Sequence, residues 1–282
     1  MNPVQSEILY SRTGSVVRLA VPLAAVLAIA AWFYVAPPGL LGKLDALGYA
    51  ICHRIGERSF HIGDRALPLC ARCTGEFFTA AVTLIYFAIT SPRRSQLPAR
   101  GLILVLVSFF LAFGIDGANS YLYLLKSSAP GSFDNIPNLY MPNNTLRLIT
   151  GSGMGITLAT VLYPILNQTL WRSPDERRVL DWHSLGTLLA IVTVLDGLIL
   201  TGSPLVLYPA AILSTLGVLT LLVIVFGILW IVMMKQENVF DEARQLWLPG
   251  SAGLTLSLLL ILSIDLVRYQ LTGTWNGFPG LG

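Results

Sequence analysis

Charged residues are scarce in this chain: Asp, Glu, Lys and Arg together make up 12% of its 282 residues. A soluble domain carries about twice that share, and the mean hydropathy of this chain is high at +0.69. This shortage excludes an ordinary soluble globular protein. The net charge is only +3, and the basic residues fall in short clusters between apolar runs, which argues against a nucleic-acid partner. The composition instead predicts an integral membrane protein whose main partner is the lipid bilayer.

Long polar segments are missing as well, so no separate soluble domain fits between the apolar runs. Seven of these runs approach the ~20 residues that a helix needs to cross a bilayer. They are Val16–Val35, Gly75–Thr90, Gly101–Leu124, Leu146–Leu166, Leu185–Thr201, Leu205–Met234 and Leu246–Leu271. We therefore expect an all-α fold, a polytopic transmembrane helix bundle of about seven spans. Its expected parts are an N-terminal tail with the first span (1–48), a membrane domain with a Cys/His motif (49–160) and the C-terminal helical spans (161–282).

Basic residues in the short loops indicate how the spans are oriented, because Lys and Arg are enriched on the cytoplasmic side. The loops after the second, fourth and sixth spans are basic, with Arg93, Arg94, Arg100, Arg172, Arg177, Arg178, Lys235 and Arg244. This pattern predicts a cytoplasmic N-terminus and an extracytoplasmic C-terminus, in the plasma (inner) membrane of a prokaryote. The Cys-rich loop between the first two spans then lies outside although it too is basic, which a folded site explains better than a topology signal.

The loop after the fourth span also carries a helix start signal. Ser173 is a suitable N-cap, Pro174 suits the first turn, and Glu176 falls at the third helical position. We expect a short interfacial helix from this point through Trp182.

Six ionisable side chains fall within the expected spans, where charges are costly and usually functional. They are Glu76, Asp116, Arg147, Asp196, Asp265 and Arg268, and under the predicted orientation each lies in the outer half of its span. This common depth indicates a polar cavity that opens outward. The alternative is structural ion pairing between helices, for example of Asp116 with Arg147, and both can hold at once. In the same region Gly151 and Gly155 are four residues apart, a spacing that lets two membrane helices pack closely.

All three cysteines of the chain lie in one short stretch, together with two of its three histidines. Cys70 and Cys73 are three residues apart at the start of the second span, which places both sulfurs on one face of a helix, within reach of one tetrahedral metal ion. Cys52 is the expected third ligand, and His53 or His61 the fourth. Zinc is the default for mixed thiolate and imidazole ligands, with iron and copper as alternatives. Four ligands would make a closed structural site, whereas three ligands and an open position favour catalysis.

Two interpretations without a metal stay open. Outside the cytoplasm, Cys70 and Cys73 can form a disulfide and exchange with Cys52 in a thiol–disulfide redox reaction. The plainer alternative is a structural disulfide with one spare thiol. The metal site ranks first, because a disulfide alone does not require histidine and arginine side chains around it.

At these residues the chain resembles an uncharacterised family of predicted membrane proteins, domain of unknown function 2085 (DUF2085). Its first pattern, Cys-His, Arg-Ser-Phe and Pro-x-Cys-x-Arg-Cys-x-Gly, falls on Cys52, His53, Arg58, Ser59, Phe60, Pro68, Cys70, Arg72, Cys73 and Gly75. A second block falls on Asp116, Asn144, Arg147 and Gly151. Arg54 departs from the usual Gln, and Glu76 stands where an aliphatic residue is common. The resemblance covers about residues 50–155 and implies a membrane location and a shared Cys/His/Arg/Asp site, without an activity.

These observations favour a protein that acts on a membrane-associated anionic substrate. Arg58, Arg72 and Arg147 are the candidates for binding an anionic group, such as a lipid phosphate or a carboxylate, and Asp116 is the candidate for orienting Arg147 or taking a proton. The main alternative is a non-enzymatic scaffold or accessory subunit of a membrane complex, with membrane-protein partners, in which a closed metal site pins a loop. Ion transport through the acidic cavity ranks last, because the inner halves of the spans are apolar.

Overall fold

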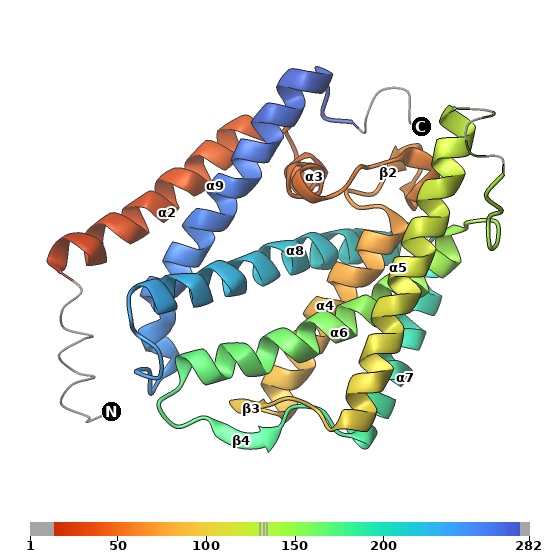
Figure 1. The fold of residues 1–282 in the computed structure, drawn as a ribbon. Helices are drawn as coiled ribbons and strands as arrows, with labels where there is room; N and C mark the ends of the chain where they lie inside the picture. The colour runs from red at the N-terminus through yellow and green to blue at the C-terminus, as the bar shows by residue number, and fades with distance from the viewer. Residues whose placement is uncertain (1–13, 130, 132, 134, 277–282) are drawn as a thin grey trace.

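The fold is helical throughout. The computed structural model describes residues 14–276 apart from residues 130, 132 and 134, so most of the predicted N-terminal tail lies outside the described residues. Within the described part the α-helices are α2 (Ser15–Val35), α3 (Leu40–Ile51), α4 (Ala71–Thr90), α5 (Arg100–Ser128), α6 (Asn144–Leu170), α7 (Trp182–Leu200), α8 (Pro204–Met233) and α9 (Trp247–Thr272). Figure 1 shows their arrangement.

Among the described residues, seven helices are long and apolar enough to cross a membrane. They are α2 and α4 to α9, so the predicted all-α transmembrane bundle of about seven spans is confirmed. Of the described α-helices, only α3 was not expected. The division into segments 1–48, 49–160 and 161–282 stays a prediction.

The contact between α4 and α6 forms the centre of the bundle, and glycines make it close. A Cβ atom on Gly151 would lie 2.2 Å from the backbone oxygen of Arg72, and one on Gly155 would lie 2.3 Å from that of Glu76. Both distances are far below van der Waals contact, so only glycine fits at either position. The predicted packing role of Gly151 and Gly155 is therefore confirmed, and the first turn of α4 is fixed against α6.

The segment between α2 and α4 folds as a compact cap on the bundle. It contains α3, a short 3-10 helix η1 (Gly56–Arg58), and a two-stranded antiparallel hairpin of β1 (His61–Ile62) and β2 (Arg65–Ala66). Gly63 makes the hairpin turn with a positive φ of +60°, a conformation that glycine adopts without strain. This cap carries Cys52 and leads into the N-terminus of α4.

The loops at the other end of the bundle join in a second small sheet. Strand β3 (Arg94–Gln96) pairs in parallel with β4 (Asp175–Arg178), and a 3-10 helix η2 (Ala243–Leu246) precedes α9. The interfacial helix expected from Ser173 to Trp182 is wrong. The reason is tertiary: the N–H of Asp175 donates to the carbonyl of Arg93 at 2.9 Å, so extended pairing with a distant loop replaces the local helical bonds.

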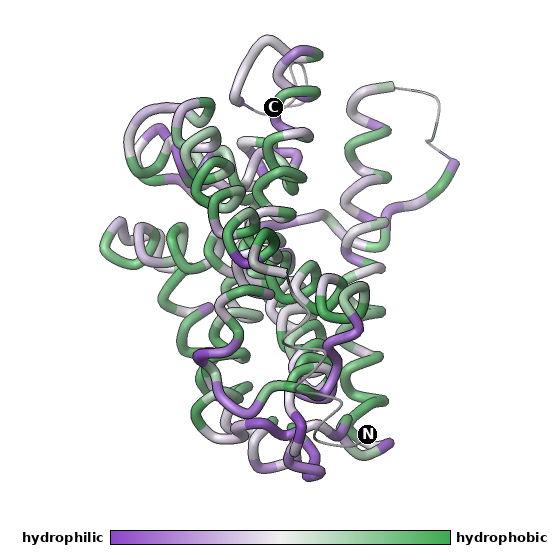
Figure 2. Tube along the Cα trace, turned by 90° about the vertical axis from the view of Figure 1, so that its left-hand side faces the viewer, coloured by the Kyte–Doolittle hydropathy of each residue, from purple (hydrophilic) through white to green (hydrophobic). Residues whose placement is uncertain are grey.

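The two small sheets lie at opposite ends of the bundle (Figure 1). We call the end with α3 and the β1–β2 hairpin the thiol end, and the other the β3–β4 end. In Figure 2 hydrophilic segments gather most densely at the β3–β4 end, while the helices between the ends are mostly hydrophobic. The C-terminus of α9 returns to the thiol end, where Tyr49 of α3 donates a hydrogen bond to the carbonyl of Thr274 at 2.7 Å.

Candidate thiol and arginine site

The three cysteines meet where α3 ends and α4 begins. Cys52 is the C-cap residue of α3, Cys70 is the N-cap residue of α4, and Cys73 lies in the first turn of α4. Their Sγ atoms all lie within 4.8 Å of one another, and all three are free thiols. The backbone N–H of Cys70 donates to Sγ of Cys52 at 3.3 Å. Residues that are 18 positions apart in the chain are thus held as one group of sulfurs.

The sulfurs share protons, and the negative charge is favoured on Cys70. The hydrogen bond that Cys52 makes to Cys70 raises the pKa of Cys52 to about 12. The same hydrogen bond, with a second from Cys73, holds the pKa of the Cys70 thiol well below its usual range. One thiolate stabilised by two neighbouring sulfurs is the protonation pattern of a prospective metal or redox site.

Arg268 of α9 holds the backbone that carries Cys52. Its guanidinium donates to the carbonyl oxygens of Cys52 at 2.6 Å and His53 at 3.1 Å, and also to that of Tyr49. It also stacks on the Tyr49 ring, 3.9 Å from the centroid. The last span therefore caps the open carbonyls at the end of α3 and fixes where Cys52 lies.

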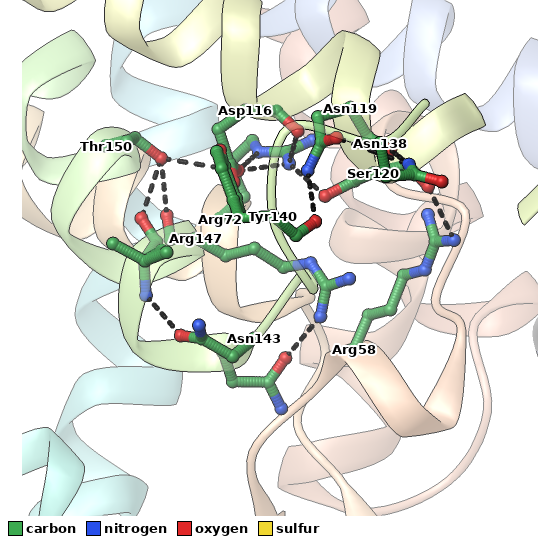
Figure 3. A network of polar contacts seen from close by, with 12 residues as sticks. Arg58, Arg72, Asp116, Asn119, Ser120, Asn138, Tyr140, Asn143, Arg147 and Thr150 are labelled. Atoms are coloured by element: carbon green, nitrogen blue, oxygen red, sulfur yellow. Dashed lines mark hydrogen bonds and ion pairs between the residues drawn. The ribbon is translucent and has the colours of Figure 1, made fainter. Parts of the chain in front are cut away.

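Arg72 forms a partly buried ion pair with Asp116 (Figure 3). The Nε of Arg72 donates to Oδ2 of Asp116 at 3.0 Å, and its Nη2 donates to Oγ of Ser120 at 3.1 Å. Tyr140 donates from its hydroxyl to the other carboxylate oxygen of Asp116 at 2.8 Å. Burial raises the pKa of Tyr140 to about 12, and its bond to Asp116 adds to the shift. Asp116 thus joins α4, α5 and the loop before α6.

The pairing of Asp116 with Arg147 suggested by the sequence does not occur. Arg147 instead donates from Nη1 to the side-chain oxygen of Asn144 at 2.8 Å. The physical reason is position: Arg72 lies on the first turn of α4, where it reaches Asp116 directly, while Arg147 is held one helical turn from the start of α6 by Asn144.

Arg58 and Arg147 differ from Arg72 in their partners. Within the part of the chain that the structure describes, neither has a carboxylate within ion-pairing distance. Arg147 is only 6% exposed, and its Nε is buried without a hydrogen-bond acceptor. Arg58 donates to the backbone oxygen of Ser120 at 3.1 Å. Burial, with repulsion from Arg72, lowers the pKa of Arg58.

One cavity of about 200 Å³ joins the sulfurs to these arginines. Its wall comes from α3, η1, α4, α5 and α6, with the three cysteines and three arginines named above together with Ile51, His53, Arg54, Ile55, Gly117, Tyr121 and Leu124. Thiols and uncompensated positive charge therefore face the same space. This is the arrangement in which an anionic group would be bound beside a sulfur centre.

The two candidate histidines differ in where they lie. His53 lines this cavity, while His61 lies on β1 with its side chain exposed. Neither belongs to the group of metal-ligating atoms that lie within 4.8 Å of one another, which among the described residues comprises the three cysteines. The assignment of His53 as a ligand stays a prediction.

The remaining intramembrane ionisable groups do not share one cavity. Of the six, only Arg147 lines the cavity described above. Asp196 accepts a hydrogen bond from Ser152 at 3.0 Å and lines a separate cavity between α5, α6 and α7. Asp265 is 1% exposed, and neither of its carboxylate oxygens has a hydrogen-bond partner among the described residues. The common depth seen in the sequence thus corresponds to several local sites.

Tyr140 and Ser120 are among the network residues that the sequence did not indicate. Tyr140 lies in the loop before α6 and Ser120 on α5, and both reach the ion pair of Arg72 with Asp116. Neither belongs to a motif, because an isolated tyrosine or serine in a loop or span carries no distinctive signal. Only the folding of the loop against α5 brings them to the site.

These features define an all-helical integral membrane protein with a buried thiol and arginine site at one end. The chain belongs to the DUF2085 family of predicted membrane proteins, whose model matches residues 52–161. It is 31% identical to an uncharacterized protein of Methanothermobacter thermautotrophicus over 112 residues. This matched stretch covers 39% of this chain and 83% of that protein. It is 25% identical over 130 residues to an uncharacterized protein of Methanocaldococcus jannaschii, covering 46% and 72% respectively. No solved structure matches.

The matched segment contains the whole cysteine and arginine set, from Cys52 through Arg147, and ends within α6. The Arg268 contact to the Cys52 carbonyl lies outside it, on α9. The family match therefore covers the cysteines and arginines of the candidate site, while Arg268, which holds the backbone of Cys52, comes from the C-terminal spans beyond the match.

Proposed function

We propose that Cys52, Cys70 and Cys73 bind one metal ion and that the neighbouring arginines hold the anionic group of a membrane-associated substrate beside it. The observation that carries this proposal is the shared cavity: three sulfurs within 4.8 Å of one another face the same space as Arg58 and Arg147. Two positive charges without carboxylate partners in such a space are poorly explained by structural ion pairing.

Zinc is the ion that the donor set favours. Zinc–thiolate bonds are ~2.3 Å long, so sulfurs around a tetrahedral zinc lie roughly 3.8 Å apart, which the present group meets with small adjustments. Three sulfurs leave a fourth position for His53 or for a substrate atom on the cavity side. When bound, the ion would supply a Lewis acid next to the anionic group.

The roles of the polar residues follow from their contacts. Arg58 and Arg147 are the proposed anion-binding groups, since both lack a carboxylate partner among the described residues. Arg72 joins them in the cavity, and Asp116 holds its guanidinium in place through the partly buried ion pair. Asp116 is therefore proposed to position Arg72, in place of the predicted orientation of Arg147.

We propose that the thiol end faces away from the cytoplasm, in a prokaryotic plasma membrane. The basic loops support this orientation, because those after α4, α6 and α8 meet at the β3–β4 end, and clustered Lys and Arg favour the cytoplasmic side. An alkaline phosphatase fused after α9 is expected to be active in cells, and an inactive fusion would reverse the assignment.

The test is metal content measured together with free thiols on protein purified anaerobically. We expect about one equivalent of zinc per chain, lost in Cys70→Ser and kept in His61→Ala, the matched control for a histidine outside the sulfur group. His53→Ala then separates the two forms of the site, because loss of metal would make His53 the fourth ligand and retention would leave that position to the substrate. A wild-type protein without metal would overturn the proposal.

Thiol–disulfide exchange is the second candidate, and the same proximity of the three sulfurs supports it. In that case the preparation would contain no metal and one free thiol per chain in air, with all three recovered after reduction. Three free thiols without metal in air would exclude both candidates.

A further inference from the structure

We infer that the anionic substrate of this site is a long-chain phosphate amphiphile whose hydrocarbon tail lies in an apolar groove between α4, α6 and α8. This inference rests on the proposed anion-binding role of the arginines and is independent of the metal. It adds the substrate class and a second half of the binding site.

The groove has a volume of about 310 Å³. The described residues that line it carry no charged or hydrogen-bonding side chain; they are Ile51, Phe77, Leu158, Val161, Leu162, Val218, Leu221, Leu222 and Val225. Such a lining excludes a polar ligand and suits a hydrocarbon chain.

Several side chains that line the groove also pack against the cysteines. Cys52 packs in one apolar cluster with Val218, and Phe77 and Leu222 lie against that cluster together with Cys70 and Cys73. Phe77, Val218 and Leu222 are also groove walls. Ile51 lines both the groove and the arginine cavity. The sulfur group therefore lies between a polar compartment and an apolar one.

The open edge of the groove faces the surrounding lipid. Val161 on α6 and Val225 on α8 are 42% and 48% exposed, and both helices are membrane spans. A tail can thus enter sideways from the bilayer without passing through water. Because the bilayer itself is apolar, the tail gains little from leaving it, so selectivity has to come from the head group.

The head group that fits is a phosphate. Arg58 and Arg147 supply guanidinium donors without carboxylate partners among the described residues, and the carboxylate-paired Arg54 and Arg72 line the same cavity. Guanidinium groups match the geometry and charge of a phosphate better than those of a neutral head group. With the tail in the groove and the phosphate at the arginines, the junction of head and tail lies beside the cysteines.

A second cavity, also lined by Cys52 and His53, is the alternative location for the hydrocarbon tail. It lies between α3 and α9, and its walls include Ile264, Val267 and Leu271. Its only guanidinium is that of Arg268, which donates to the carbonyls of Cys52 and His53. A phosphate there would have to displace these bonds, so we assign the tail to the groove of α4, α6 and α8.

The experiment is photolabelling of the full chain in phosphatidylcholine nanodiscs. The probe is hexadecyl phosphate with a diazirine in its chain, and hexadecyl phosphocholine with the same chain is the zwitterionic arm, whose phosphate charge is balanced by choline. Inorganic phosphate, added as competitor, separates a requirement for the lipid from binding of the free anion. Labelled residues are located by mass spectrometry. Val225→Trp fills the edge of the groove, and Leu229→Trp is the control, because Leu229 lies one turn further on α8 with a similar exposure of 47% but outside the groove.

We expect the phosphate probe to label groove residues at least tenfold more strongly than the phosphocholine probe. Val225→Trp and Arg58→Gln should each reduce this labelling about tenfold, and Leu229→Trp should leave it unchanged. Labelling of Ile264, Val267 or Leu271, equal labelling by both probes, or an unaffected Val225→Trp protein would overturn the inference. Full displacement by millimolar inorganic phosphate would show that the site takes the free anion and would overturn it as well.

The failure of this inference is distinguishable from failure of the proposed function. Metal content is measured on the same preparations, so labelling without metal would retain the lipid site and remove the metal centre. Bound metal without selective labelling would retain the metal centre and remove the lipid site.

Discussion

The two ends of this molecule use arginine in different ways. At the thiol end the side chains of Arg54 and Arg72 are 8% and 17% exposed and each pairs with a carboxylate. At the β3–β4 end the side chains of Arg177 and Arg244 are 72% and 82% exposed. Both ends are basic in sequence, and at the thiol end the arginines line a cavity with the cysteines. The comparison teaches that the basic loops of one membrane protein can differ in burial: some of their arginines line a cavity, while others stay hydrated.

The energetic reason lies in solvation. An exposed ion pair competes with water and is screened by salt, so it contributes little. A buried guanidinium has lost its water and depends on its partner, so removing that partner is costly. Arg54 and Arg72 are therefore restrained in position, whereas Arg177 and Arg244 keep their hydration.

The sharpest way to test this comparison is the same Asp→Asn change at both ends. Asp116→Asn leaves Arg72 buried without a compensating charge, and we expect the free energy of unfolding in detergent to fall by about 3–5 kcal/mol. Asp175→Asn, at the exposed pair with Arg177, should leave the unfolding curve unchanged. Equal effects of the two variants would contradict the distinction between the ends.

A second test concerns the helix contact that supports the thiol end. Gly151→Ala brings a Cβ within 2.2 Å of the Arg72 carbonyl, and we expect a loss of roughly 1–3 kcal/mol from overpacking, together with displacement of Arg72. Gly197→Ala is the matched control, since its Cβ meets nothing within 4 Å and alanine favours the helix. A Gly151→Ala protein as stable as the control would mean that α4 and α6 separate more easily than the structure indicates.

The smallest effect is expected at the β3–β4 end, where Asp181 caps α7. Its carboxylate accepts from the N–H of Ser184 at 2.8 Å, and this bond lowers the pKa of Asp181. Asp181→Ala should cost about 1 kcal/mol at neutral pH. Because the folded pKa is the lower one, the contribution is complete above the unfolded pKa of about 3.9 and is lost as pH falls through the folded value. Asp181→Asn should retain the cap without this dependence, and a pH-dependent Asn variant would assign the effect to another group.

Local sequence signals predicted the membrane spans correctly, because the bilayer imposes the same requirement on every spanning segment. Seven apolar runs became seven spans, because a helix satisfies its own backbone hydrogen bonds in lipid regardless of its neighbours. The close spacing of Cys70 and Cys73 on one helix was likewise readable. The same approach failed at Ser173, because the segment after this capping pattern pairs with β3 instead of forming a helix. It also missed α3, which is short and combines apolar with charged residues.

The sequence by itself thus determined the class of protein and the number of spans, and it singled out the cysteines and arginines that line the candidate site, because these depend on hydropathy, helical spacing and local motifs. Only the tertiary structure decided that Cys52 joins Cys70 and Cys73, that Asp116 pairs with Arg72, and that Arg58 and Arg147 remain without a carboxylate partner within the described chain. The physical reason is that partners in a buried site are chosen by distance across helices, and those distances follow from packing at positions such as Gly151.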